Sequence, residues 1–373
     1  MPGSIRLGRI LGLDIELHYS WFVVFALFAL LATWRLPREF PAMPVGQRWA
    51  LGVGVTLVFF ACLLVHEMAH SLVSRANGIE ISGITLFLFG GVSRMTEDPP
   101  SAAVELKIAA AGPMASVALA VLFWALKVMA TAGGAAAPLA AALRDLAFIN
   151  LALAAFNLLP GFPLDGGRLL RAAIWYFGGS LPRASYVASV LGQGVGYLLM
   201  AWGFVLIFAR AWVGGLWAAF IGWFLVDAAR AGHQQVLLRR ALSGVPVRAI
   251  MSADLALIPA GISIEQAVND HFLRRHFAAF PVVGQDGLKG LVGLRDIREV
   301  PTESWATTPI DQVTRPVGAA DILSPNDDSF QALARMAAAD TGRLLVMEGG
   351  ALVGIVSRTD LMRHLRARLE LDV

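Results

Sequence analysis

The sequence predicts an α-helical polytopic membrane protein, with six transmembrane helices and a membrane-associated β-hairpin, followed by a cytoplasmic α/β domain. The first observation behind this prediction is composition, because 57% of the 373 residues are hydrophobic and only 15% are charged, whereas soluble domains carry about 25% charged residues. The second is that long apolar segments fill the chain up to about residue 231. The third is that charged and turn residues return after that point, where the sequence also repeats itself.

Composition also limits the possible partners. The formal net charge of +3 fits the basic flanks of a membrane protein, and no basic cluster indicates a nucleic-acid partner. The single cysteine, Cys62, excludes an internal disulfide framework. Cys62 lies one helical turn before His66, and we interpret it as a buried thiol rather than as a metal ligand. We expect no cleavable signal in residues 2–17, because charges precede the first long apolar run.

Six apolar runs are candidates for transmembrane helices. They cover residues 19–34, 49–73, 104–130, 139–159, 184–208 and 212–229. Residues 5–17, before the first run, alternate in part between apolar and polar, which predicts a short amphipathic hairpin at the membrane surface. Lys and Arg are more frequent near the span ends that share a side with the N-terminus. We therefore expect a multi-pass protein with both termini in the cytoplasm.

The second apolar run ends in the sequence His66-Glu67-Met68-Ala69-His70. Residues four apart share one face of a helix, so both imidazoles can reach one zinc ion, and Glu67 can take a proton from water at the metal. Residues 51–64 contain no charge, so such a site would lie inside or against the membrane. Two satisfied core histidines are the alternative, but the cost of burying charge in a bilayer favours a functional site.

A carboxylate in apolar surroundings follows the fourth apolar run. Asp165 comes after a helix-breaking stretch rich in Pro and Gly, where hydropathy is still high. It is either a third zinc ligand or the N-cap of a helix over 166–175 that pairs with Arg168. Asn157 in the same stretch either hydrogen-bonds a substrate or caps the broken helix.

Two further segments have an interpretation. Residues 79–95 predict a hairpin with a turn at Gly90-Gly91, which either lies in the membrane beside the metal site and offers an edge to a substrate strand, or is an ordinary interfacial hairpin. In the third apolar run, the small residues of 111–116 predict close helix packing.

The C-terminal part contains two copies of one unit. After a basic, helical linker over 232–245, residues 246–305 and 306–373 align with each other, each with a short strand, a helix, two strands and a closing helix. In the second copy, Ser357 and Asp360 either contact the ribose of a nucleotide or cap a helix. In the first copy only Asp296 remains, because Gly293 replaces the serine.

Taken together, these motifs resemble the site-2 protease family of membrane-embedded zinc metalloproteases. The resemblance rests on the histidine motif, on Asn157 with Pro160 and Asp165-Gly166, on Phe89-Gly90-Gly91 and on Gly112-Pro113. The repeat resembles a tandem pair of cystathionine-β-synthase-type (CBS) domains. The match is nearest to the bacterial and archaeal branch with a cytoplasmic CBS pair, which implies a prokaryotic plasma membrane. Ser116 stands where the family often has Asn.

The resemblance implies roles for individual residues. His66, His70 and Asp165 would bind one Zn²⁺ per chain, Glu67 would be the general base, and Asn157, Gly90 and Gly91 would contact the substrate or the oxyanion. The expected division is 1–231 for the protease domain, 232–245 for the linker, and 246–305 and 306–373 for the CBS domains.

The resemblance also implies partners. The substrate would be a transmembrane protein cut by regulated intramembrane proteolysis, with an adenine nucleotide at the CBS pair and a homodimer formed through it. The alternatives are a CBS-regulated metal-ion transporter or channel and a catalytically inactive receptor. Many transporters consist of repeated halves, and residues 1–230 show no such repeat, which disfavours the transporter.

Overall fold

The structure is a computed structural model that describes residues 3–88, 90–95, 98–275, 277, 279–285, 287–339 and 341–371. The chain divides into two compact units, Met1–Gln234 and Gln235–Val373. We call them the membrane unit and the C-terminal unit, and each is described by itself.

Seven helices of the described residues belong wholly or largely to the membrane unit. They are α1 (Ser20–Glu39), α2 (Val45–Ala76), α3 (Ala102–Ala132), α4 (Ala137–Asn157), α5 (Asp165–Gly178), α6 (Leu181–Phe208) and α7 (Trp212–Leu242). All except α5 are long and apolar enough to cross a membrane, which confirms the six predicted spans. Several helices extend past their apolar runs, because polar residues beyond the bilayer continue the same helix. Helix α7, for example, includes most of the predicted linker.

The strands of the membrane unit form one mixed sheet in the order β1-β2-β3-β4. The strands are β1 (Ser4–Ile10), β2 (Leu13–His18), β3 (Ile81–Phe87) and β4 (Gly90–Met95). The sequence predicted two hairpins, and the structure joins them through a parallel pairing of β2 with β3. The physical reason is a shared core, since apolar side chains of both strands, Leu13, Ile15 and Ile84 among them, are buried in one apolar cluster.

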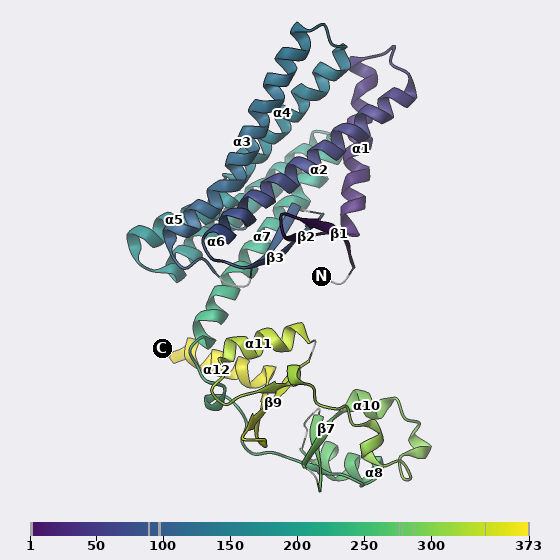
Figure 1. The fold of residues 1–373 in the computed structure, drawn as a ribbon, viewed down its shortest axis with the longest axis vertical. Coiled ribbons are helices and arrows are strands. Elements are labelled where there is room, and N and C mark those ends of the chain that lie inside the picture. Colours follow the sequence, from purple (N-terminus) through teal and green to yellow (C-terminus); the bar gives the residue numbers. More distant parts are fainter. Residues whose placement is uncertain are drawn as a thin grey trace. The chain divides into compact units, whose positions relative to one another are not determined.

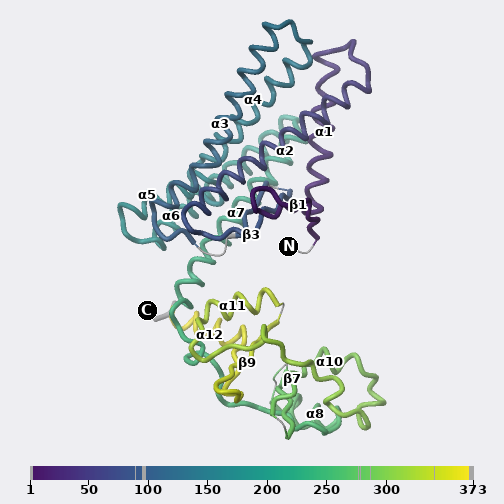
Figure 2. The backbone as a smooth tube through the Cα atoms, viewed as in Figure 1, coloured from purple at the N-terminus to yellow at the C-terminus, as the bar shows by residue number. Residues whose placement is uncertain are grey.

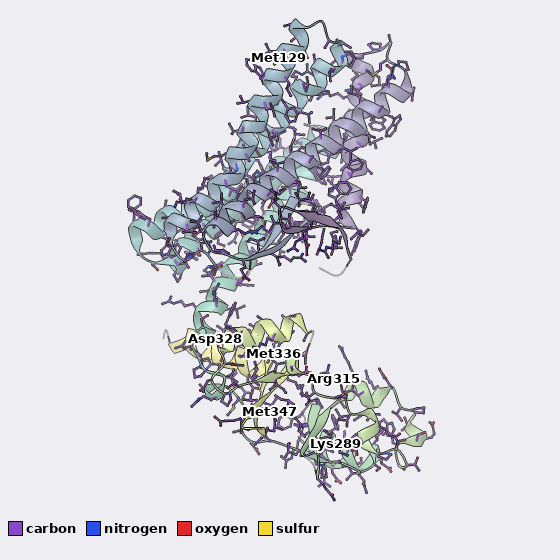
Figure 3. The ribbon with its side chains drawn as sticks, viewed as in Figure 1. Met129, Lys289, Arg315, Asp328, Met336 and Met347 are labelled. Atoms are coloured by element: carbon purple, nitrogen blue, oxygen red, sulfur yellow. The ribbon has the colours of Figure 1, made fainter. Side chains whose placement is uncertain are left out.

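The sheet and α5 lie at the same end of the helical bundle, opposite the connection between α3 and α4 (Figure 1). Met129, near the C-terminal end of α3, marks the opposite end (Figure 3). Helix α5 is attached to α3 by an ion pair between Arg171 and the fully buried Glu105. This arrangement brings the start of α5 toward the C-terminal half of α2.

The C-terminal unit consists of two copies of one topology, which can be followed one after the other along the backbone tube in Figure 2. In each, the first two strands of a three-stranded sheet are parallel and the last two form an antiparallel hairpin. The first copy contains β5 (Ile258–Pro259), α8 (Ile264–Ala267), α9 (Leu273–Arg275), β6 (Ala279–Gly284), β7 (Gly287–Gly293) and α10 (Leu294–Arg298). The second contains β8 (Ile322–Leu323), α11 (Ser329–Ala338), β9 (Arg343–Glu348), β10 (Ala351–Ser357) and α12 (Arg358–Leu371).

The segments that begin the two copies are exchanged. Val247 is buried in the core of the second copy, together with Met336 of α11 (labelled in Figure 3). Ile310 is buried in the core of the first copy, and Asp311 beside it pairs with Lys289 of β7 at 3.1 Å. Each copy therefore completes its core with a segment that the sequence alignment assigns to the other.

One carboxylate connects all four strands of the membrane unit's sheet. Glu16 of β2 accepts hydrogen bonds from Arg94 of β4 at 2.7 and 3.1 Å, from Ser4 of β1 at 2.9 Å and from Thr85 of β3 at 3.2 Å. The Arg94 hydrogen bonds hold the pKa of Glu16 below its ordinary value of 4.5. The ionised form is therefore favoured in the fold, so this stabilisation is present above about pH 4.5 and is lost as the pH falls through the lowered pKa.

We expect Glu16→Gln to lower the hydrogen-exchange protection of β4 at pH 7, because the ionised acceptor that Arg94 binds is removed. The wild type should lose the same protection on acidification, while the variant should show little further change. The measurement is hydrogen exchange by mass spectrometry, corrected for intrinsic rates. Asp14→Asn, which removes a pair with Arg6 of β1, is the matched control. Equal effects of the two variants on β4 would contradict the assignment.

Candidate active site

Two imidazoles and one carboxylate converge inside the membrane unit. His66 and His70 lie on adjacent turns of α2, and Asp165 is the first residue of α5. Each imidazole Nε2 lies 3.2 Å from Asp165 Oδ2, and the two Nε2 atoms lie 3.2 Å apart. The three residues are 2%, 5% and 8% exposed. This is an arrangement of ligand atoms around one point, shielded from solvent.

The structure excludes one of the two interpretations of Asp165 that the sequence left open. Leu164 occupies the N-cap position of α5, and Asp165 follows it inside the first turn. The Asp165 carboxylate contacts the imidazoles, and no ion pair joins it to Arg168 among the described residues. The N-cap interpretation is therefore wrong.

Two glycines allow α5 to begin so close to the broken end of α4. A Cβ on Gly166 would overlap the carbonyl groups of Leu158 and Leu159, and one on Gly167 would overlap the backbone of Gly161. Because no side chain fits at either position, the Gly166-Gly167 pair is a packing requirement for Asp165 to reach α2.

Groups of helix α3 contact the Nδ1 atoms of both imidazoles. His70 Nδ1 lies 2.7 Å from the carbonyl oxygen of Ile108, and His66 Nδ1 lies 2.9 Å from Ser116 Oγ. When both Nδ1–H groups donate to these oxygens, both Nε2 lone pairs face the point of convergence. A Cβ added to Gly112, between these two contacts, would collide with Nε2 of both histidines. The absence of a side chain there leaves space at the ligand atoms.

These residues fit a zinc ion. Two imidazole nitrogens and one carboxylate oxygen, with a fourth position open, are a common donor set of catalytic zinc sites. The outer hydrogen bonds of both imidazoles are those expected around such a metal. Sequence reasoning missed these contacts and assigned Gly112 and Ser116 to helix packing. The available signal was their spacing, since residues 108, 112 and 116 lie on one face of a helix.

The cluster opens into an apolar cavity of about 560 Å³. Besides the three clustered residues, its polar lining includes Glu67, Ser93, Asn157 and Arg168. The apolar lining comes from several helices and both strands of the β3–β4 hairpin, and includes Val24, Phe28, Phe59, Phe60, Leu63, Phe87, Leu88, Val92, Ile149, Leu153, Phe156, Trp217, Ile221, Phe224 and Leu225. Such a cavity suits an apolar segment that needs polar chemistry at one point.

Strand β4 reaches the cavity through the glycines that the sequence singled out. Gly90 and Gly91 both line it, and a Cβ on Gly91 would collide with the side chain of Glu67. Phe89, named with them in the resemblance, lies outside the described residues. Asn157 also lines the cavity, but its amide group donates to Leu153 of its own helix at 3.1 Å. Cys62 is buried and does not belong to the candidate metal-binding group of the described residues.

The candidate nucleotide residues of the C-terminal unit are at helix starts. Ser357 and Asp360 bond each other across the first turn of α12, with Ser357 Oγ donating to Asp360 Oδ2 at 2.5 Å. Asp296 accepts a hydrogen bond from the backbone N–H of Gly293 at 2.7 Å. These bonds are the capping interactions that the sequence analysis gave as an alternative.

Comparison with known proteins agrees with this architecture. A model of peptidase family M50 matches residues 54–144 and 128–201, and a model of the CBS domain matches residues 247–303 and 313–367. The chain is 36% identical over 365 residues to Rip3 of Mycobacterium tuberculosis, a protein assigned as a zinc metalloprotease, covering 97% of this chain and 93% of Rip3.

Two further proteins are similar. A protein of Synechocystis, also assigned as a zinc metalloprotease, is 32% identical over 369 residues, with 98% of this chain and 96% of the relative covered. The solved site-2 protease of Methanocaldococcus jannaschii superposes with a TM-score of 0.44 at 27% identity, over 62% of this chain and 95% of that one. From the sequence relatives and the two family matches, the chain belongs to peptidase family M50, the site-2 proteases, and is a membrane-embedded zinc metalloprotease with a tandem CBS pair.

Proposed function

We propose that His66, His70 and Asp165 bind one zinc ion per chain and that Glu67 is the general base for hydrolysis of peptide bonds in or near the transmembrane segments of membrane proteins. The observation that carries the proposal is the buried, convergent donor set, with Glu67 beside it, at the wall of a large apolar cavity. An apolar cavity accepts the side chains of a transmembrane segment, and the polar groups at one wall define where a bond is cut.

A zinc ion bound there would supply a Lewis acid that acidifies water and polarises a peptide carbonyl. Glu67 accepts a proton from the attacking water while the water oxygen bonds to the carbonyl carbon. Glu67 then delivers that proton to the amide nitrogen, the C–N bond breaks, and the products are a carboxylic acid and an amine, which ionise in water. Ser116 and the Ile108 carbonyl keep both imidazoles oriented throughout.

The substrate must present an extended backbone, because a helix engages its carbonyl groups in internal hydrogen bonds. Strand β4 is the last strand of the sheet and lines the cavity with residues 90–93, so an unwound substrate segment could add to it as a further strand. Since the amide group of Asn157 already donates to Leu153, its carbonyl oxygen remains to accept a bond from a substrate N–H.

The C-terminal unit is proposed as the regulatory part. The charge asymmetry of the sequence supports a cytoplasmic location for both termini and for this unit. Asp296 and Asp360 occupy matching positions in the first turn of the helix that follows the hairpin in each copy, where an adenine nucleotide would compete with the capping bonds. We propose that nucleotide binding and dimerisation through the CBS pair gate the access of substrates.

The space at Gly112 generates a test of the zinc site. We expect Gly112→Ala to reduce bound zinc from one per chain toward zero, because the new methyl group occupies the position of the imidazole Nε2 atoms. Asp165→Ala and the double variant His66→Ala/His70→Ala should lose zinc as well. Metal analysis of detergent-purified protein is the measurement. Gly54→Ala, on α2 with open space around it, should keep the zinc, and zinc that persists in Asp165→Ala would contradict the three-ligand site.

The role of Glu67 is tested by Glu67→Gln. We expect this variant to keep its zinc and to lose about 10²–10⁴-fold in cleavage rate, since a glutamine cannot take up the proton of the attacking water. A reconstituted assay with a single-span membrane substrate, analysed by mass spectrometry, gives the rate. Retained activity with a full complement of zinc would exclude Glu67 as the base.

The gating proposal is tested with nucleotides. ATP, ADP or AMP should change the cleavage rate of the full chain and leave the rate of a variant without residues 246–373 unchanged. The deletion begins after α7 ends, so the helices of the membrane unit stay intact. An identical rate and substrate selectivity of the two proteins, with and without nucleotide, would remove the CBS pair from catalytic control.

A further inference from the structure

One charged group in the wall of the catalytic cavity has no role in the proposed mechanism. Arg168 follows Asp165 by three residues on α5, so the two side chains share a face of that helix. Both line the same cavity as Glu67, and Arg168 is the one Arg or Lys of the described lining. Its side chain is only 16% exposed. A cation in this position is expensive in an apolar interior unless an oxygen atom contacts it.

The nearest carboxylate is already neutralised by a different arginine. Glu105 is fully buried, and Arg171 donates to it from both Nε, at 2.6 Å, and Nη2. Arg171 also lies over the Phe162 ring at 4.9 Å. Arg168 approaches Glu105 only to 4.0 Å, the outer limit of an ion pair. Within the part of the chain that the structure describes, no hydrogen bond from the Arg168 guanidinium is formed.

The other donors of the described lining are neutral and partly engaged. Asn157 uses one N–H of its amide on Leu153 at 3.1 Å, and Ser93 Oγ shares a hydrogen bond of 2.9 Å with Ser71 Oγ. Glu67 and Asp165 offer only acceptors when ionised. Arg168 therefore supplies a fork of N–H donors, permanently charged, to a cavity whose reaction creates negative charge on a carbonyl oxygen.

We propose that Arg168 is a catalytic residue that donates hydrogen bonds to the carbonyl oxygen of the cleaved peptide bond and stabilises its negative charge as water adds. This inference rests on the proposed function, because it concerns the transition state of that hydrolysis. It takes over the oxyanion role that the sequence suggested for Asn157.

The test compares Arg168 with its neighbour. We expect Arg168→Gln to lower kcat by about 10²–10³-fold, the usual cost of removing an oxyanion donor. Its KM should change little, because the bond strengthens only in the transition state. Its zinc content and melting temperature should match the wild type. Arg168→Lys should recover part of kcat, because it keeps the charge without the fork.

Arg171→Gln is the matched control. It leaves Glu105 buried without its partner, so it should lower the melting temperature while the folded enzyme keeps kcat within a few-fold of the wild type. If Arg171→Gln does not fold, Arg171→Lys takes its place. Loss of stability or of zinc in Arg168→Gln to the same extent as in the Arg171 variant would overturn the proposal, as would an unchanged kcat.

Two variants distinguish a failure of the Arg168 role from a failure of the proposed function. If Glu67→Gln is inactive and Arg168→Gln keeps the kcat of the wild type, the role of Arg168 falls and the proposed function stands. If Glu67→Gln retains activity with its zinc bound, the proposed mechanism falls and the transition-state role of Arg168 falls with it.

Discussion

The structure of the membrane unit depends on burying two imidazoles and a carboxylate against one another in apolar surroundings. Such groups are costly to remove from water singly, and they become acceptable when each satisfies the others or a shared cation. The surrounding fold keeps these groups close together. Helix α3 fixes both histidines from one side, and the broken end of α4 delivers Asp165 from the other.

Glycines bring the backbone close enough for these groups to meet. Gly112 opens space at the imidazoles, Gly166 and Gly167 let α5 start on the end of α4, and Gly91 brings β4 against Glu67. At each of these positions a methyl group would overlap backbone atoms or a side chain of the candidate site. The glycines thus determine the geometry of the site as much as the residues with reactive groups do.

The reactive groups were predictable from the sequence to the extent that they lie close along the chain. The spacing of His66 and His70 places both on one helical face whatever the rest of the fold does. The orientation of Asp165 was not predictable from local pattern, because an N-cap carboxylate bonds its own helix whereas this one meets the imidazoles of α2, which lie far away in the chain. For the same reason the contact of Ser116 with His66 was missed, since a hydroxyl in a small-residue stretch has the signature of packing.

In the sheet, too, local sequence predicts burial but not the pairing of strands that lie far apart in the chain. Alternation in residues 13–17 predicts which of these side chains are buried, but it does not tell which strand pairs with them. The parallel pairing of β2 with β3 follows only when the two buried faces meet in one core. The exchange of the first segments between the two CBS copies was likewise invisible to an alignment, which compares copies but not their contacts.

The parallel pairing of β2 with β3 has a topological consequence. Two helices long enough to cross the membrane, α1 and α2, separate these strands in the chain. Two crossings return a chain to the side from which it started, and only then can both strands belong to one sheet. A chain that inserted α1 without α2, or α2 without α1, would leave β2 and β3 on opposite faces of the bilayer. The sheet holds β4 beside Glu67, and the sheet can assemble only on one side of the bilayer. The active site therefore depends on correct insertion of the first two helices.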